Sequence, residues 1–198
     1  MKKAISILLA AAMGAAALTG CSKSSGSSSS GNTPLVLNEV AHSIFYAPQY
    51  AAIELGYFED EASLTLVNGA GADKVMTALI SGDAQIGFMG SEASISNQEG
   101  SQDYAVNFAQ LTQRAGNFPV GRQPEDNFKW ESLKGKKVLG GRAGGMPQMV
   151  FEYILKKHGR TKQDLSIDQS INFGLTAAAF TSDDADYTVE FEPFATTL

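Results

Sequence analysis

The sequence predicts an α/β fold of two lobes, and three observations support this expectation. Short apolar runs alternate with helical patterns between residues 35 and 114, an order that favours a parallel sheet with helices on both faces. A polar stretch at 117–128 contains Pro119 and Pro124, so we expect a crossover there rather than a strand or helix. A second alternation of strands and helices follows from residue 137. We therefore place a first lobe at 35–114 and a second lobe at 115–198.

The first lobe is expected to hold four strands separated by three helices. Tyr46, Tyr50 and Ile53 recur at spacings of four and three residues, which is typical of one face of a helix, and Gly56 ends it. A second helix passes through 75–80 and is closed by Gly82, and a third covers 92–98. The expected strands cover 35–40, 64–67, 84–89 and 104–113.

The second lobe repeats the pattern on a smaller scale. Strands are expected at 137–140, 165–173 and 187–190. A helix begins near Pro147, where the missing N–H costs nothing, and ends at Gly159. A shorter helix passes through 177–180. Two such lobes joined by extended segments are typical of hinge-bending proteins.

The amino-terminal end has the pattern of an export signal. Lys2 and Lys3 precede an uncharged apolar run at 4–18, and this run is shorter than the ~20 residues that a membrane-spanning helix needs. The run ends in Leu18-Thr19-Gly20-Cys21 and resembles the bacterial lipobox. We expect a signal peptide at 1–20, a lipid on Cys21 and a flexible Ser/Gly-rich tether within 21–34, which places the protein outside the cytoplasm. The alternative is an ordinary signal with an incidental cysteine.

Composition excludes several classes of partner. Cys21 is the only cysteine, so neither a disulfide framework nor a thiolate metal site is expected. The formal net charge is −6, which disfavours nucleic acid and anionic lipid as partners of a basic patch. We expect a monomer that meets the membrane only through the lipid.

Six segments after the tether form a recognisable set, at 38–48, 52–58, 71–74, 81–87, 144–147 and 191–193. Together they resemble the NMT1/THI5-like and sulfonate-binding solute-binding proteins, and the resemblance covers nearly all of the chain after the tether. It implies a periplasmic-binding-protein-like (type II) fold of two lobes. It also implies delivery of a small solute to the permease of an ABC importer. Members of the family continue past the Phe191-Glu192-Pro193 segment, so we expect a second lobe that is incomplete at the carboxyl end.

Ligands of open α/β sheets bind beyond the carboxyl ends of the strands, and this rule selects the candidate site. Helix N-termini at Ala72, Glu92 and Met146 would direct backbone N–H groups to the same place. Each candidate has a structural alternative. His42 could hydrogen-bond within a turn, Phe45 and Tyr46 could pack in the core, and Asp73 could interact favourably with a helix dipole. The ligand-binding candidates are His42, Phe45, Tyr46, Asn68, Gly71, Asp73, Ser91, Glu92, Thr112, Arg142, Gly144, Gly145, Met146 and Glu190.

Acids outnumber cations among these candidates, which favours a nitrogen-bearing heterocycle, such as a thiamin-type pyrimidine precursor, over an anion. An aliphatic sulfonate, taurine or nitrate is the alternative, and a remnant or surface protein that binds no solute is another. An enzyme related to pyrimidine synthases is disfavoured, because the resemblance there implies a cysteine-rich iron segment that this sequence lacks. No Gly-x-Ser-x-Gly elbow or Walker loop is present. We expect no cofactor and no metal.

Overall fold

The computed structural model describes residues 32–100, 102–172, 174–182 and 184–198. Asn32–Leu198 forms one compact unit. The predicted signal peptide, the lipid site at Cys21 and most of the tether lie outside the described residues and stay predictions. No helix among the residues described is long and apolar enough to cross a membrane.

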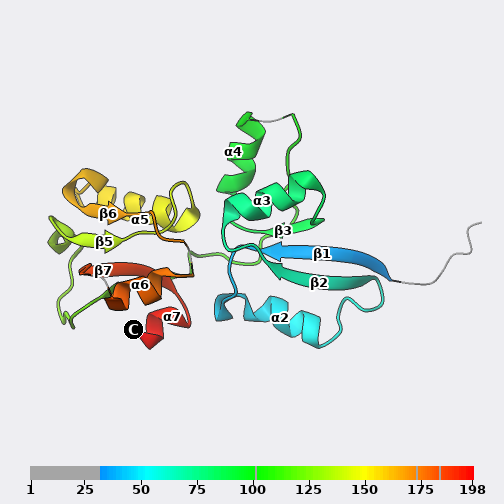
Figure 1. The fold of residues 1–198 in the computed structure, drawn as a ribbon, viewed down its shortest axis with the longest axis horizontal. Helices are drawn as coiled ribbons and strands as arrows, with labels where there is room; N and C mark the ends of the chain where they lie inside the picture. The colour runs from blue at the N-terminus through cyan, green and yellow to red at the C-terminus, as the bar shows by residue number, and fades with distance from the viewer. Residues whose placement is uncertain (1–31, 101, 173, 183) are drawn as a thin grey trace, which may run out of the picture. The chain divides into compact units, whose positions relative to one another are not determined.

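The first sheet is parallel, as predicted, with strand order β2-β1-β3. Its strands are β1 (Thr33–Glu39), β2 (Ala62–Asn68) and β3 (Ile86–Phe88). Figure 1 shows helix α2 on one side of this sheet and helices α3 and α4 on the other. The helical elements are η1 (Ile44–Tyr46), α2 (Ala47–Glu54), α3 (Ala72–Ser81) and α4 (Glu92–Gly100).

The strand predicted at 104–113 is wrong, since these residues have no regular structure. The segment makes side-chain hydrogen bonds to α4 where a strand would make a backbone ladder: the Ala105 N–H donates to Asn97 Oδ1 (3.2 Å), and Asn107 Nδ2 donates to Ser94 Oγ (2.9 Å). Its apolar side chains, Phe108 above all at 78 % exposure, face solvent. Residues 104–113 therefore join neither edge of the first sheet, whose edge strands are β2 and β3.

The second sheet is mixed, with strand order β4-β7-β5-β6. Strands β5 (Lys137–Leu139), β6 (Ser166–Asp168) and β7 (Tyr187–Phe191) are parallel, and β4 (Asn117–Gly121) runs antiparallel to β7. Its helical elements are η2 (Trp130–Leu133), α5 (Met146–Lys157), η3 (Lys162–Asp164), α6 (Thr176–Ser182) and α7 (Phe194–Thr197).

Strand β4 corrects the prediction of a crossover over the whole of 117–128. Pro119 pairs with Val189 across the ladder, and a proline is tolerated there because β4 is the edge strand of its sheet. The strand predicted at 165–173 is also shorter than expected, since β6 covers three residues. The lobe boundary near residue 115 stays a prediction.

The largest apolar core belongs to the second sheet. Leu155, from α5, and Val138, from β5, are almost completely buried there. The whole cluster comprises Leu133, Val138, Phe151, Leu155, Leu165, Tyr187 and Val189. This core fixes α5 against the sheet and thereby sets where the amino-terminal end of α5 lies.

Candidate functional site

A cavity lies where the carboxyl ends of β1 and β2 come close to that of β7. Its volume is about 230 Å³, and its position is the one that open α/β sheets use for ligands. We call it the strand-end cavity. The residues that line it are Val40, Ala41, His42, Ser43, Asn68, Ala70, Gly174, Glu190, Phe191 and Phe194.

A buried carboxylate supports the β1 side of the cavity. Glu39 is 1 % exposed and forms what we call the Glu39 network. Its Oε2 accepts hydrogen bonds from Tyr50 Oη (2.8 Å) and Gln49 Nε2 (3.3 Å), and its Oε1 lies 2.8 Å from His42 Nδ1. Buried carboxylates are stable only when such partners satisfy them. The network leaves His42 Nε2 as the ring nitrogen available to a ligand.

The short segment after β1 is held in place from both sides. Ser43 caps η1, because its Oγ accepts a hydrogen bond from the Phe45 N–H (3.2 Å). The same hydroxyl donates to the Glu192 carbonyl at 2.5 Å, so it links the β1 end to the β7 end. The Ser43 N–H donates to Tyr50 Oη (3.1 Å). His42 and Tyr50 stack with ring centroids 4.6 Å apart.

The two tyrosines beside Glu39 carry neutral phenol groups. Burial, and then the negative charge of Glu39, raise the pKa of Tyr46 to about 12. Burial is also the largest cause that raises the pKa of Tyr50 to about 12, with the Ser43 N–H acting in the opposite direction. Both phenols therefore keep their protons at any physiological pH.

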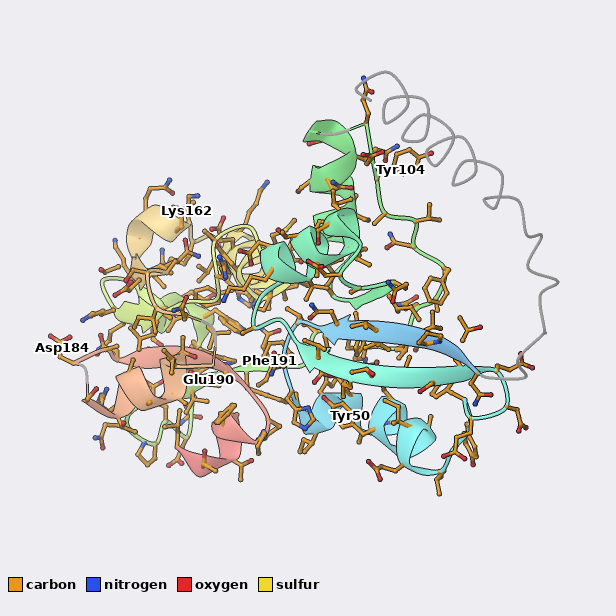
Figure 2. All side chains as sticks on the ribbon, turned by 45° about the vertical axis from the view of Figure 1, so that its right-hand side comes forward. Tyr50, Tyr104, Lys162, Asp184, Glu190 and Phe191 are labelled. Carbon is orange, nitrogen blue, oxygen red and sulfur yellow. The ribbon has the colours of Figure 1, made fainter. Side chains whose placement is uncertain are left out.

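Glu190 is the acid on the β7 side of the cavity. It is buried, and Thr188 Oγ1 donates to its Oε1 at 2.7 Å. Burial raises the pKa of Glu190 above its ordinary value, while hydrogen bonds from Thr188 and Thr176 act against this. Figure 2 marks Glu190 and Phe191 on β7 and Tyr50 on α2. A group with such a pKa can accept a hydrogen bond as a carboxylate or donate one as an acid.

Three of the predicted site residues line the cavity, namely His42, Asn68 and Glu190. Part of the Asn68 side chain is used locally, because its Oδ1 accepts a hydrogen bond from the Ala70 N–H (2.9 Å) and holds a turn in which Ala70 has a φ of 55°. Contact between these three residues and a solute stays a prediction.

Two aromatic candidates have structural contacts. Tyr46 is buried, with its ring 4.4 Å from that of Phe88, which is the core role considered as its alternative. Phe45 packs near Phe191, with ring centroids 6.3 Å apart. Thr112 belongs to the segment at 102–116 that has no regular structure until β4 begins, and it does not line the cavity.

The remaining candidates do not line the cavity, and four of them form two polar links. Arg142 Nη2 lies 2.6 Å from Asp73 Oδ2. Glu92 Oε1 accepts a hydrogen bond from the Met146 N–H (3.0 Å). The neighbouring candidates supply backbone: Gly71 and Gly145 are the N-caps of α3 and α5, Gly144 has a φ of 77°, and the Ser91 carbonyl accepts from Ser94 Oγ (2.8 Å).

Sequence reasoning missed Glu39 as a support of the site. A signal for Glu39 existed, since an acid at the end of an apolar strand must find partners if it is buried. The Ser43 link to Glu192 spans 149 residues and has no local signal.

Comparisons with known proteins agree with this architecture. The sequence model of the family described as NMT1/THI5 like matches residues 44–195. YtlA of Bacillus subtilis (strain 168), whose name describes it as a candidate binding protein, is 46 % identical over 166 residues, which are 82 % of this chain and 50 % of YtlA. The chain thus spans about half the length of this relative.

Two solved structures share the fold. A protein of Bordetella bronchiseptica RB50 superposes with a TM-score of 0.63 at 23 % identity, over 84 % of this chain and 54 % of that one. The periplasmic aliphatic sulphonate binding protein SsuA of Escherichia coli superposes with a TM-score of 0.53 at 16 % identity, over 83 % of this chain and 56 % of SsuA. The predicted α/β periplasmic-binding-protein-like fold is confirmed.

Proposed function

Because the chain belongs to the NMT1/THI5-like family, we propose that it is the solute-binding component of an ABC importer, anchored outside the membrane by a lipid on Cys21. The 46 % identity to YtlA supports a binding role over catalysis. The strand-end cavity supports it as well, because a cavity between the two sheets is where a hinged binder encloses its solute.

We further propose that the solute is a small nitrogen heterocycle such as a thiamin-type pyrimidine precursor. The observation that carries this proposal is the chemistry of the cavity wall: His42, Asn68 and Glu190 line it, and none of the described lining residues is a lysine or arginine. An amino-substituted ring offers N–H donors to Glu190 and a ring nitrogen or an amino group to His42.

The size and the apolar part of the wall agree with a single ring. Pockets for drug-sized ligands occupy roughly 300–1,000 Å³, and this cavity is about 230 Å³. Phe191 and Phe194 line it and offer faces for offset stacking.

An aliphatic sulfonate is the second candidate, favoured by the fold shared with SsuA. The wall opposes it, because none of the described lining residues is a lysine or arginine that would pair with a sulfonate. An ionised Glu190 would also repel the sulfonate.

Calorimetry and thermal shift with the full chain test both proposals. We expect 4-aminopyrimidines to bind and to stabilise the chain by about 2.7 kcal/mol at a hundred times Kd, with taurine, ethanesulfonate and nitrate inactive. His42→Ala and Glu190→Gln should each weaken binding at least tenfold. Asp184→Asn, a change at an exposed acid that does not line the cavity, is the control. Binding of taurine alone would contradict the heterocycle, and binding of no solute would contradict the carrier role.

A further inference from the structure

The amino-terminal end of α5 has the properties of an anion site. The helix has twelve residues, and its N-cap, Gly145, makes no side-chain hydrogen bond to it. The first backbone N–H groups of a helix are left without helical partners, and the helix dipole adds partial positive charge there. A phosphate, sulfate or carboxylate is the usual occupant of such a position.

Here the occupant is a carboxylate of the chain itself. Glu92 begins α4, and its Oε1 accepts a hydrogen bond from the Met146 N–H at 3.0 Å. The two residues are 54 positions apart and come from elements of different sheets. Glu92 is only 8 % exposed, and its Oε2 is buried without a hydrogen-bond partner among the described residues.

The backbone around Glu92 accommodates this position. A Cβ at Gly90 would lie 2.0 Å from Glu92 Oε2, so a side chain there would displace the carboxylate. The buried placement of Glu92 therefore depends on the glycine two residues before it.

The positive side chain beside this position is also neutralised internally. Arg142 lies in the loop that precedes α5, and its Nη2 pairs with Asp73 Oδ2 at 2.6 Å. A Cβ at Gly71 would lie 2.7 Å from Arg142 Nη1, so Gly71 leaves the room that this pair needs. The α5 N-terminus and Arg142 would each attract an anion. Each is instead paired with an acid from a helix of the first sheet, Glu92 of α4 and Asp73 of α3 respectively.

We propose that Glu92 determines specificity by occupying the α5 N-terminus with an internal carboxylate, which excludes sulfate, sulfonates and phosphates. This inference rests on the proposed role of the chain as a solute binder. A second anion would meet a buried like charge, which is costly.

Removal of the carboxylate should turn this position into an anion site. Sulfate and ethanesulfonate are titrated into the full chain, its Glu92→Ala variant and its Glu92→Gln variant by calorimetry at low ionic strength. A helix N-terminus of this kind changes anion affinity by about tenfold, so we expect Glu92→Ala to bind sulfate at least about tenfold more tightly than the unchanged chain.

A matched control separates this effect from a change in overall charge. Glu152 lies on α5 itself and contacts Gln148 and Lys162, so Glu152→Gln removes the same charge from the same helix away from its N-terminus. Equal gains in sulfate affinity for Glu152→Gln and Glu92→Ala would overturn the proposal, as would tight sulfate binding by the unchanged chain. If Glu92→Ala does not fold, the isosteric Glu92→Gln variant carries the test, and no gain in that variant also overturns it.

The 4-aminopyrimidine titration keeps the two proposals distinguishable. A chain that binds no heterocycle but gains sulfate affinity on loss of Glu92 contradicts the proposed carrier role and supports the internal anion. A chain that binds the heterocycle and gains nothing in either Glu92 variant contradicts the internal anion alone.

Discussion

Replacement of Glu39 by glutamine should lower the free energy of unfolding by about 2 kcal/mol. The carboxylate accepts from three side chains, Tyr50 and Gln49 on Oε2 and His42 on Oε1. Hydrogen bonds to a charged group contribute about 1.5–3 kcal/mol each and neutral ones about 0.5–1.5. The glutamine amide retains one accepting oxygen, so the three hydrogen bonds become neutral ones. Its NH2 group then faces a side chain that had donated a hydrogen bond to the carboxylate.

His42 limits this loss. Its ring can present an unprotonated Nδ1 to the new NH2, which moves the proton to Nε2 and changes the nitrogen that faces the strand-end cavity from acceptor to donor. Part of the loss is also offset because the variant no longer buries a charge. Glu39→Leu removes the acceptor altogether. It leaves the buried Gln49 amide without this partner and should cost more than Glu39→Gln.

Urea unfolding at pH 7 with linear extrapolation measures these values. Tyr50→Phe and the double variant complete a cycle, for which we expect a coupling energy of about 1 kcal/mol between positions 39 and 50. A loss below about 0.5 kcal/mol for Glu39→Gln, or strict additivity in the cycle, would refute the view that the carboxylate organises this wall of the cavity.

Three further changes probe the core and the acids. Leu155→Ala should cost about 3 kcal/mol in urea unfolding, because the side chain is completely buried, whereas Leu55→Ala, at a residue 65 % exposed, should cost less than about 0.5. Asp186→Asn should reduce the loss of stability at acid pH, because the Lys137 N–H, and then the Lys136 ammonium, lower the pKa of Asp186. The stabilisation from Asp186 is present above the ordinary aspartate pKa and is lost as pH falls through the lowered pKa. An unchanged loss of stability at acid pH in the variant would contradict this. Burial raises the pKa of Glu190, so the unchanged chain should lose stability as pH rises from the ordinary glutamate pKa through the raised value. Glu190→Gln should remove this loss. Parallel stability curves for the two proteins between pH 4 and 8 would show the reasoning to be wrong.

The fold was predictable where each element has a local signal. Spacings of three and four residues located α2, and Gly82, with a φ of 83°, ends α3 as predicted. The incorrect predictions concern segments whose structure depends on strand pairing. Residues 104–113 have a strand's composition but no ladder, and Pro119 sits in a strand because β4 is an edge. Pairing partners more than fifty residues away cannot be read from a local pattern.

The candidate site follows the same division. The carboxyl-end rule located His42, Asn68 and Glu190, since it needs only the strand boundaries. It could not identify which acids are buried and satisfied. Glu39 was overlooked although its partners lie within 11 positions of it. Glu92 was expected near a ligand without its contact to Met146, because that contact spans 54 positions.

The antiparallel pairing of β4 with β7 also sets an order of assembly for a chain that emerges from its amino-terminal end. All three strands of the first sheet are available once residue 88 has emerged. In the described part of the second sheet, β4 neighbours β7 alone, and Asn117 pairs with Phe191, 74 positions later. Pairing at such sequence separation is slow, because the intervening loop must first be closed. The Glu39 wall of the cavity can therefore form early in synthesis, whereas the Glu190 wall cannot form until β7 has emerged.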